Sequence, residues 1–379
     1  MIGPAVVELR PEIAIQTEER EIRRTVVDCD WSFSALGSEW NSLLLAGEAA
    51  SPFLTWEWLH SWWRHLGRSS RLRMLTVRAG SELIAIAPFH LTTGVAYLPC
   101  LDMLGTGEAG SDYLDVIVRP GYEADSLAAI ERFVASQKTA LRLTHLGASA
   151  AAAQLAVALE RRGWRCVTTA GGTCPYIPLA EHTWDSYLAT LGASHRANVR
   201  RRLRALEQKY EMRFERVTGD RERCEGLERL AHYHKRRFDA RGTAFRTPSL
   251  RAFHDEATRR LLDRGWLRMF ILRLNDSPAA VMYGLFFNRT FYFYQHGFDD
   301  SYQQHSIGQV LMALSIRAAI DEGAAAFDML WGTEPYKFLW ARQTRDLRNI
   351  HLFPPDLGGQ LHRGLFHARR RMGAFIHVS

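Results

Sequence analysis

The stretch from Arg289 to Leu330 constrains the fold of this chain more than any other segment. It reads RTFYFYQHGFDDSYQQHSIGQVLMALSIRAAIDEGAAAFDML. An aromatic run at Thr290–His296 predicts a strand, and a polar loop follows it. Apolar residues at helical spacing then predict a helix over Ile307–Glu322, and Ala325–Leu330 reads as a second strand. The segment therefore predicts a strand, a tight turn, a helix and another strand in close succession.

The turn in this segment carries the pattern Gln303-x-x-Ser306-x-Gly308 at the start of the predicted helix. Free backbone N–H groups at a helix start point outward and, together with the helix dipole, favour a phosphate or another anion. A small residue lets such a ligand approach the backbone. The pattern predicts an anion cradle formed by Ser306, Ile307, Gly308, Gln309 and Val310. The alternative is an ordinary helix N-terminus with Ser306 as its N-cap.

Length and composition favour a folded protein of two domains. The chain has 379 residues, of which 47% are hydrophobic and 11% aromatic. No apolar run reaches the ~18 residues of a membrane-spanning helix, and the acidic N-terminal segment does not read as a secretory signal. The five cysteines form no C-x-x-C pair, so neither a zinc site nor a disulfide framework is expected. We expect a cytoplasmic protein without a metal.

The net charge of +7 is concentrated in two places. Residues 194–213 hold six Arg and one Lys against two Glu, and residues 361–379 hold four Arg and no acid. In the first patch, Val199, Leu203, Leu206 and Tyr210 form an apolar stripe, so the arginines should face outward. That face is either a solvated helix surface or an anion-binding site formed by Arg200, Arg201 and Arg204.

Two blocks with the same order of elements can be read along the chain. Each has helices, an antiparallel meander, a helix, a strand, a helix and a strand. The fold class expected is α/β (α+β), with two tandem domains that each contain a mixed, mostly antiparallel sheet flanked by helices. The divisions predicted are a flexible arm at 1–25, an N-terminal domain at 26–180, a C-terminal domain at 181–355 and a basic tail at 356–379.

The element predictions behind these blocks come from periodicity and turn residues. In the first block, strands are predicted at Leu72–Arg78, Leu83–Leu91, Val95–Leu101, Tyr113–Val118, Leu141–Leu146 and Trp164–Ala170, and helices at Phe33–Leu45, Glu123–Gln137 and Ala150–Arg162. The range Ser51–Gly67 is predicted to be a short loop that leads into an aromatic-rich helix. In the second, further helices are predicted at His195–Tyr210, Glu222–Arg241, Ser249–Arg264 and Tyr336–Ala341, and further strands at Leu267–Leu274, Ala279–Phe287 and Leu347–Phe353.

Four segments together resemble one family of enzymes. They are SPFLTWEWLHSWW, SDYLDVIV, SHRANVRRRLRALE and DMLWGTEPYKFLWA. Their arrangement resembles the CelD-like (cellulose-biosynthesis-like) acetyltransferases of the GNAT superfamily, which are related to the Fem peptidoglycan transferases. The resemblance covers roughly residues 30–355, and Ser306 departs from the family turn, Gln/Arg-x-x-Gly-x-Gly/Ala, by replacing its first glycine. It implies tandem GNAT-like domains, the second binding acyl-CoA, and acyl transfer to an amine or a hydroxyl.

The resemblance also implies roles for particular residues. A slot for the pantetheine arm of acyl-CoA (acetyl-CoA) would lie between the strands at 290–296 and 325–330, against the backbone of Gln295, Gly297 and Phe298. Tyr336 would protonate the departing thiolate. Lys337 would steady a phosphate or a carboxylate of the acceptor. The candidates for the general base are Asp328, Glu334, His296 and Asp299; Asp328 has a structural alternative, in which it holds the loop at Gly332.

Acceptor binding is assigned to the first domain. The acids at the end of a strand beside the Gly105–Gly107 loop are costly to bury and are expected to face a cleft, so Asp112, Tyr113 and Asp115 form the candidate acceptor site. The tryptophans at 56, 58, 62 and 63 have helical spacing and are expected in the core.

The activity expected is direct acyl transfer from acyl-CoA to an envelope-related, exopolysaccharide-related or small-molecule acceptor. One alternative is a Fem-like transferase that uses aminoacyl-tRNA; otherwise no nucleic-acid partner is expected. A second alternative is a non-catalytic GNAT-like protein that supports polysaccharide assembly. The basic tail, which carries Phe366, Phe375 and Ile376 among its arginines, is either a frayed end or a peripheral contact with an anionic membrane surface.

Overall fold

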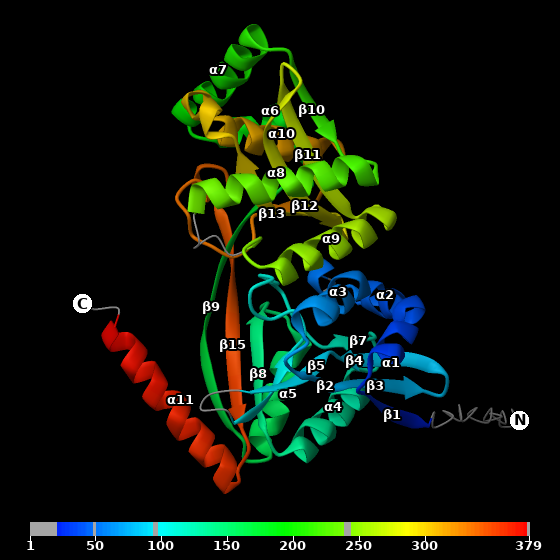
Figure 1. Ribbon diagram of the computed structural model, residues 1–379. Coiled ribbons are helices and arrows are strands. Elements are labelled where there is room, and N and C mark those ends of the chain that lie inside the picture. The colour runs from blue at the N-terminus through cyan, green and yellow to red at the C-terminus, as the bar shows by residue number, and fades with distance from the viewer. Residues whose placement is uncertain (1–20, 48–50, 94–97, 239–243, 377–379) are drawn as a thin grey trace, which may run out of the picture.

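A computed structural model describes residues 21–47, 51–93, 98–238 and 244–376. Parts of four predicted segments fall outside these ranges: residues 1–20 of the N-terminal arm, residues 95–97 of one strand, residues 239–241 of one helix and residues 377–379 of the basic tail. The remaining elements form a mixed α/β molecule in which helices flank mostly antiparallel sheets (Figure 1).

The first half of the chain contains these described elements: β1 (Ile22–Val27), α1 (Asp30–Ala35), α2 (Gly37–Ala46), η1 (Pro52–Leu54), α3 (Trp56–Leu66), β2 (Arg71–Leu72), β3 (Met74–Ala79), β4 (Glu82–Ala87), β5 (Phe89–Thr93), β6 (Pro99–Met103), β7 (Ile117–Val118), α4 (Glu123–Gln137), β8 (Ala140–Leu146), α5 (Ala151–Arg161) and β9 (Arg165–Pro178).

The second half contains α6 (Trp184–Thr190), α7 (Ala193–Lys209), β10 (Met212–Arg216), α8 (Asp220–Phe238), α9 (Pro248–Asp263), β11 (Leu267–Leu274), β12 (Ser277–Phe287), β13 (Thr290–Phe298), η4 (Asp300–His305), α10 (Ile307–Asp321), β14 (Ala326–Asp328), η5 (Lys337–Leu339), β15 (Gln343–Phe353) and α11 (Leu357–Ile376).

Two sheets organise the described residues. The smaller has the order β1-β3-β4-β7, and the larger has the order β10-β11-β12-β13-β14-β9-β15-β8-β6-β5-β2. The long strands β9 and β15 pair antiparallel and run through both halves of the molecule (Figure 1). β9 also pairs with β14 of the second half, while β15 pairs with β8 of the first. The two halves therefore share one continuous sheet.

Both faces of the sheet in the second half are covered by helices, which explains the apolar run from Met269 to Leu272 within β11. Met269 and Ile271 belong to an apolar cluster that also holds side chains of α8 and α9. The alternate residues Phe270 and Leu272 belong to a second cluster, with side chains of α10. Successive side chains of a strand point to opposite faces, so a strand buried on both sides is apolar throughout.

The first of these clusters also crosses from one half to the other. The ring centroids of Trp58, on α3, and Phe253, on α9, lie 4.9 Å apart, and Phe53 lies 6.1 Å from Tyr292. Trp58 and Trp62 are buried, as expected of the core, while Trp56 and Trp63 pack against the cluster partly exposed. Burial of this apolar surface holds the two halves together.

Most predicted elements begin and end within a few residues of the observed ones. Four predictions differ from the structure in the type or the extent of the element. Residues Tyr113 to Val116, predicted as part of a strand, form an irregular segment before β7. β9 extends eight residues beyond Ala170, because β14 and β15 both pair with it. β1 begins inside the range predicted as an arm, and the predicted basic tail contains α11. The domain limits themselves remain a prediction.

Candidate functional site

The strands β13 and β14 separate after a short parallel contact. Thr290 to Tyr292 pair with Ala326 to Asp328, and no later residue of β13 pairs with β14. β13 continues to Phe298 along β12, whereas β14 pairs on its other side with β9. The carbonyl of His296, beyond the point of separation, accepts a hydrogen bond from Nε2 of His234 on α8 at 3.0 Å. The open edge of β13 can receive the backbone-like amides of a ligand.

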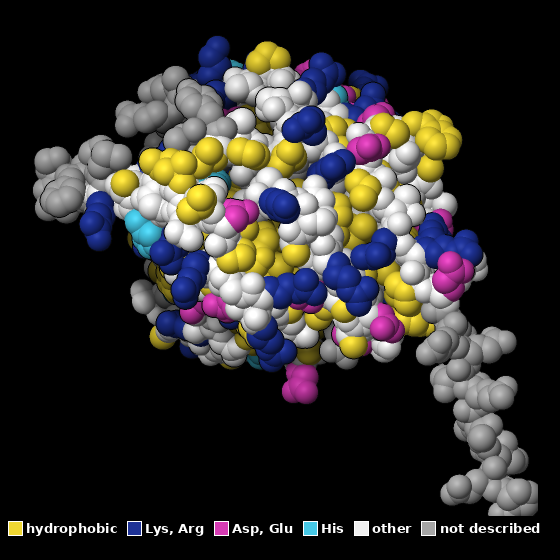
Figure 2. Space-filling model, turned by 90° about the horizontal axis from the view of Figure 1, so that it is seen from below, with side chains coloured by type: hydrophobic (Ala, Val, Ile, Leu, Met, Phe, Trp, Pro, Cys, Tyr) yellow, Lys and Arg dark blue, Asp and Glu magenta, His cyan; other side chains and the backbone are white. Residues whose placement is uncertain are grey.

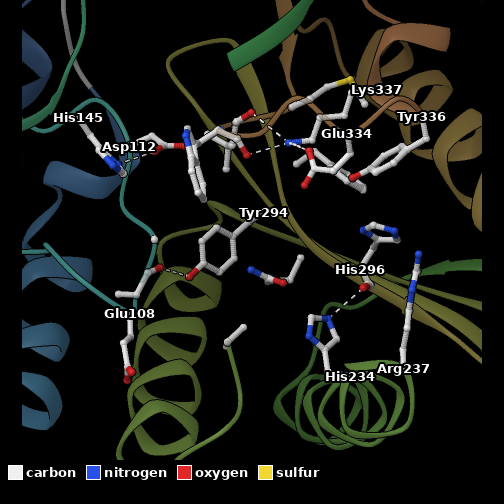
Figure 3. A pocket seen from close by; sticks show the side chains of 18 of the residues that line it. Glu108, Asp112, His145, His234, Arg237, Tyr294, His296, Glu334, Tyr336 and Lys337 are labelled. Carbon is white, nitrogen blue, oxygen red and sulfur yellow. Dashed lines mark hydrogen bonds and ion pairs between the residues drawn. The ribbon is translucent and has the colours of Figure 1, made fainter. Parts of the chain in front are cut away.

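A cavity of about 930 Å³ lies beside this open edge and between the two halves (Figure 3). Glu108, Asp112 and His145 line it from the first half. From the second half its lining includes His234, Arg237, Tyr294, Gln295, His296, Trp331, Glu334, Tyr336 and Lys337. Figure 3 shows the first group on one side of the cavity and His296, Tyr336, His234 and Arg237 on the other. The size and the convergent polar groups suit a ligand site.

Tyr336 and His296 lie together on the second-half wall of this cavity. Their ring centroids are 5.7 Å apart. Burial raises the pKa of Tyr336, and the nearby Glu334 adds to the effect. Burial, helped by the positive charge of Arg237, lowers the pKa of His296 to about 3. Tyr336 therefore holds its proton at neutral pH, while His296 is a neutral and weakly basic imidazole.

Glu334 and Lys337 form part of the loop that follows β14. Nζ of Lys337 donates to the carbonyl oxygens of Leu330 at 3.2 Å and Trp331 at 2.9 Å. It also lies 3.1 Å from a carboxylate oxygen of Glu334. The lysine is only 4% exposed. Its contacts fasten the loop from inside, so the structure gives Lys337 a supporting place in the cavity wall rather than a free ammonium group for a phosphate.

Asp328 lies behind the cavity wall and its carboxylate is fully engaged. One oxygen accepts from Tyr113 Oη at 2.8 Å and from Arg345 at 2.7 Å. The other accepts from the backbone N–H of Leu330 at 2.9 Å. Burial raises its pKa, although these partners act against the rise. The structure therefore does not bring Asp328 into the cavity with Tyr336 and His296. Instead, the Asp328 carboxylate links the loop after β14 to the first half.

The three candidate acceptor residues of the first half have different places. Asp112 lines the cavity, and Tyr113 reaches Asp328 as described. Asp115 is separate from both: its oxygens accept the backbone N–H groups of Ala151 and Ala152, at 2.8 Å and 2.7 Å, at the start of α5. Burial raises the pKa of Asp115 to about 7. Its contacts are those of a helix cap.

The N-terminus of α10 uses part of the predicted cradle for its own hydrogen bonds. Ser306 has a φ of 52°, and its N–H donates to Gln303. The N–H groups of Gln309 and Val310 donate to the carbonyl of Ser306. Within the part of the chain that the structure describes, the N–H groups of residues 307 and 308 have no such partner. These two groups and the helix dipole remain for an anion.

Other residues assigned to the donor site pack within the protein. A Cβ on Gly308 would lie 3.0 Å from the ring of Phe298, and one on Gly297 would lie 2.9 Å from Tyr233, so both glycines allow close packing. Gln309 Oε1 accepts from Trp340 Nε1 at 3.1 Å. Among the remaining donor-site candidates, Gln295 lines the cavity on β13, and the exposed Gln303 lies on η4.

The arginines of α7 lie beside the start of α10. Arg201 and Arg202 line a second cavity, of about 470 Å³, together with Gln304, His305 and Ser306. Arg200 lies 3.3 Å from Asp185, a weak surface ion pair, and Arg204 donates to the carbonyl of Arg200 at 3.3 Å. Positive side chains thus adjoin the two unbonded N–H groups of α10, and both favour a negatively charged group.

A comparison with protein families places a known domain over these elements. Residues 193–338 match the family model described as an acetyltransferase (GNAT) domain. This chain contains a GNAT acetyltransferase domain. The domain includes α7, the separating strands β13 and β14, the start of α10 and Tyr336. No curated protein matches the chain.

Solved structures share the fold over nearly the whole chain. The crystal structure of FemX is 12% identical, with a TM-score of 0.61 over 86% of this chain and 97% of its own. A domain from Agrobacterium fabrum, described as the C-terminal domain of a lysylphosphatidylglycerol synthetase, is 10% identical, with a TM-score of 0.55 over 89% and 96%. L-PGS from Bacillus licheniformis is 12% identical, with a TM-score of 0.50 over 84% and 96%. At these identities the likeness shows the fold alone.

Sequence reasoning did not assign several residues that line the cavity beside the GNAT domain. They are Glu108, His145, His234, Arg237, Tyr294 and Trp331. His145 stands near the end of a predicted strand, and Trp331 directly follows the segment 325–330. Polar or aromatic residues at strand ends near a predicted site were the available signal, but their convergence depends on contacts between the two halves.

Among the residues with described positions, no group of three or more His, Cys, Asp or Glu side chains could hold a metal ion. None of the helices in the described ranges is long and apolar enough to cross a membrane.

Proposed function

We propose that this protein is an acyl-CoA-dependent N- or O-acyltransferase that moves an acyl group, acetyl in the simplest case, directly to an amine or a hydroxyl. The observation that carries the proposal is the separation of β13 from β14 beside a cavity of about 930 Å³, within a domain that matches an acetyltransferase family. The open edge of β13 suits the amides of a pantetheine arm, which would bind as an added strand.

The phosphates of the donor would lie at the start of α10. The N–H groups of residues 307 and 308 and the neighbouring arginines of α7 provide hydrogen-bond donors and positive charge there. Arg201 and Arg202 reach this place from the opposite side of the second cavity. Because η4 alone separates β13 from α10, an extended donor could contact the β13 edge with its arm and α10 with its phosphates.

The reaction needs the acceptor and the thioester held together, because orientation supplies much of the rate. Backbone N–H groups along the open edge of β13 would stabilise the tetrahedral oxyanion. Tyr336, which keeps its proton at neutral pH, would protonate the departing thiolate. Of the bases proposed within the GNAT domain, Glu334 and His296 line the cavity, whereas Asp328 does not.

The acceptor would enter from the side formed by the first half, where Glu108, Asp112 and His145 line the cavity. The resemblance to CelD-like enzymes supports an acceptor connected with exopolysaccharide or the cell envelope, and a small amine or alcohol fits the same chemistry. An acceptor on this wall would face Tyr336 and His296 across the cavity (Figure 3).

A second candidate function is aminoacyl transfer from tRNA. The observation that favours it is the arginine face of α7, since Arg200, Arg201 and Arg204 are all on this helix and Arg201 lines the cavity beside the start of α10. Arginines in such an array bind phosphates well. The shared fold with FemX is compatible with this alternative.

Ligand binding separates the two candidates. Isothermal calorimetry with acetyl-CoA, a longer acyl-CoA and deacylated tRNA should show saturable binding of the acyl-CoAs and none of tRNA. A ligand at ~100 times its dissociation constant should also stabilise the folded state by ~2.7 kcal/mol in a thermal-shift experiment. Binding of tRNA without binding of acetyl-CoA would favour the second candidate, and binding of neither would refute the proposed function.

Peripheral membrane contact through α11 belongs to the same proposal. Leu357 and Leu361 are 83% and 58% exposed on this helix, and Arg363, Arg369 and Arg370 follow them. Figure 2, which views the molecule from below, shows Lys and Arg side chains spread over this face with hydrophobic side chains between them. Vesicles with anionic lipids should retain the protein on flotation, and neutral vesicles should not.

A further inference from the structure

His145 is held in an unusual place at the end of β8. Its φ of 53° lies in the left-handed region, and its backbone N–H donates to Asn349 Oδ1 at 2.8 Å. The ring Nδ1 lies 3.1 Å from the carbonyl oxygen of Ser111 and 3.0 Å from Oδ1 of Asp112. The contact with Asp112 has the distance of an ion pair without the angle of a directed hydrogen bond.

Asp112 is itself fixed by the opposite half of the molecule. It is 2% exposed, and its other oxygen, Oδ2, accepts from the backbone N–H of Trp331 at 2.8 Å. The Trp331 ring stacks on the His145 ring, with centroids 6.2 Å apart and an angle of 29° between the planes. The imidazole is therefore positioned by a carbonyl and a carboxylate from one segment, Ser111 and Asp112, and by the indole of Trp331 from another.

One ring nitrogen is left for a ligand. Both groups near Nδ1 are acceptors, so the neutral ring carries its proton on Nδ1 and a lone pair on Nε2. Nε2 has no hydrogen-bond partner among the residues that the structure describes, and the side chain is 28% exposed where it lines the cavity. A buried carboxylate that orients the far nitrogen of a histidine is the arrangement by which a base is made ready to accept a proton.

We propose that His145, positioned by Asp112, is the general base that takes the proton from the acceptor, an inference that rests on the proposed acyl transfer. The acceptor nitrogen or oxygen forms a bond to the thioester carbonyl carbon while its proton passes to Nε2. The tetrahedral intermediate then collapses with cleavage of the C–S bond, and the sulfur leaves as a thiolate that takes a proton from Tyr336. The imidazolium afterwards returns its proton to solvent.

The electrostatics of the cavity favour His145 over the other bases there. Burial lowers the pKa of His145, but the adjacent carboxylate of Asp112 and the carbonyl of Ser111 outweigh this effect, so the pKa of His145 lies above its ordinary value. His296, with a pKa lowered to about 3, holds a proton poorly. Glu334 is paired with Lys337. The other charged groups of the cavity wall are Glu108 and Arg237, and Asp112 is the acid in contact with the ring.

The first test replaces the histidine by glycine. His145→Gly suits the backbone because glycine adopts positive φ freely, and it leaves room for imidazole. Thiol release from acetyl-CoA is measured with glucosamine as acceptor and with water alone. The variant should lose ~10²-fold or more in kcat at an unchanged KM for acetyl-CoA, and added imidazole should restore part of the rate. His367→Gln, at an exposed position on α11, is the matched control and should keep the wild-type rate.

The outcomes separate this inference from the proposed function. If the wild-type protein fails to bind acetyl-CoA in calorimetry, the proposed function fails. If it binds acetyl-CoA and His145→Gly keeps the wild-type kcat, the role of His145 is refuted while the function stands. A loss that imidazole does not restore, accompanied by a changed KM for acetyl-CoA, would show a structural role and would also refute the inference.

A second measurement needs no acceptor. Nuclear magnetic resonance of ¹⁵N-labelled histidine should show the Nδ1–H tautomer for neutral His145. Asp112→Asn keeps an oxygen for the N–H of Trp331 but removes the charge, so it should lower the pKa of His145 and move the acidic limb of kcat/KM to lower pH. An Nε2–H tautomer, or a His145 pKa unchanged by Asp112→Asn, would overturn the proposal.

Discussion

Tyr113 and Asp328 join the two halves of the molecule through a hydrogen bond of 2.8 Å between the tyrosine hydroxyl and a carboxylate that is fully buried. The same carboxylate binds Arg345 on β15 and the backbone of Leu330. The loop that carries Glu334 and Tyr336 thus begins at a fixed point. The position of this cavity wall is therefore set by contacts between residues that are far apart in the chain.

Asp328→Asn should destabilise the protein, because the amide cannot accept all the hydrogen bonds of the buried carboxylate. We expect the free energy of unfolding to fall by about 2 to 3 kcal/mol. Urea denaturation of Asp328→Asn and of Tyr113→Phe measures the free energy of unfolding of each variant. Tyr113→Phe should cost less, since it removes one neutral donor. An Asp328→Asn variant of wild-type stability that has lost all transfer activity would instead assign Asp328 to the chemistry.

Tyr336→Phe should slow acyl transfer by ~10²-fold or more, because it removes the proton donor for the thiolate and keeps the ring. The affinity for acetyl-CoA, measured by calorimetry, should change little, since the interaction matters in the transition state. An acyl donor with a more acidic thiol should recover part of the rate. Wild-type turnover of the variant would show that Tyr336 only packs against His296.

Replacing Arg200, Arg201 and Arg204 together by Gln should weaken the binding of acetyl-CoA several-fold and leave the melting temperature within a few degrees. The reason is that these exposed side chains contribute charge near α10 and little to the core. Wild-type binding should weaken with added salt more steeply than that of the variant.

The matched control for this variant removes the same charge elsewhere. Arg369, Arg370 and Arg371 are exposed on α11, and their replacement by Gln should leave acetyl-CoA binding unchanged. Equal weakening in both triple variants would mean that net charge, rather than the α7 face, attracts the donor. Full-strength binding after the α7 substitutions would remove these arginines from the donor site.

Acid should destabilise the protein in part through His254. This residue is fully buried among aromatic rings, and burial lowers its pKa to about 3, against ~6.5 in an unfolded chain. The folded pKa is the lower one, so the stabilisation is present above pH ~6.5 and is lost as the pH falls toward 3. One such group contributes a slope of up to ~1.4 kcal/mol per pH unit.

The comparison of His254→Met with the wild type checks this prediction. Urea denaturation at several pH values between 7 and 4 should give a shallower loss of stability for the variant. The exposed His367→Gln should follow the wild-type slope. A His254→Met slope equal to that of the wild type would show that the buried imidazole does not contribute to acid sensitivity.

Local patterns predicted most of the elements that build the GNAT domain, although not the strand β10. The limits of α4 and β11 match the predicted ones, and the strand–turn–helix–strand segment is present at β13, α10 and β14. Helix and strand periods are properties of neighbouring residues, so a single sequence contains them. The same reasoning could not reach the extension of β9, which exists because β14 and β15 pair with it.

The candidate site residues fall into two groups, which differ in what surrounds each side chain. His296, Glu334, Tyr336 and Asp112 line one cavity, whereas Asp115 caps α5 and Asp328 lies behind the wall. An acid near a strand end reads the same in sequence whether it faces a cleft or a helix start. Only the packing around it decides which of the two it meets.

The sequence by itself determined most of the order of elements, the turn that precedes α10 and the charged face of α7, because each depends on residues within a few turns or strands of one another. The tertiary structure decided which side chains share the cavity. Asp112 meets Trp331, and His145 meets Asn349, about two hundred residues away along the chain. Such contacts depend on how the two halves pack and on how β9 and β15 cross between them. The local periodicity of the sequence does not encode this packing.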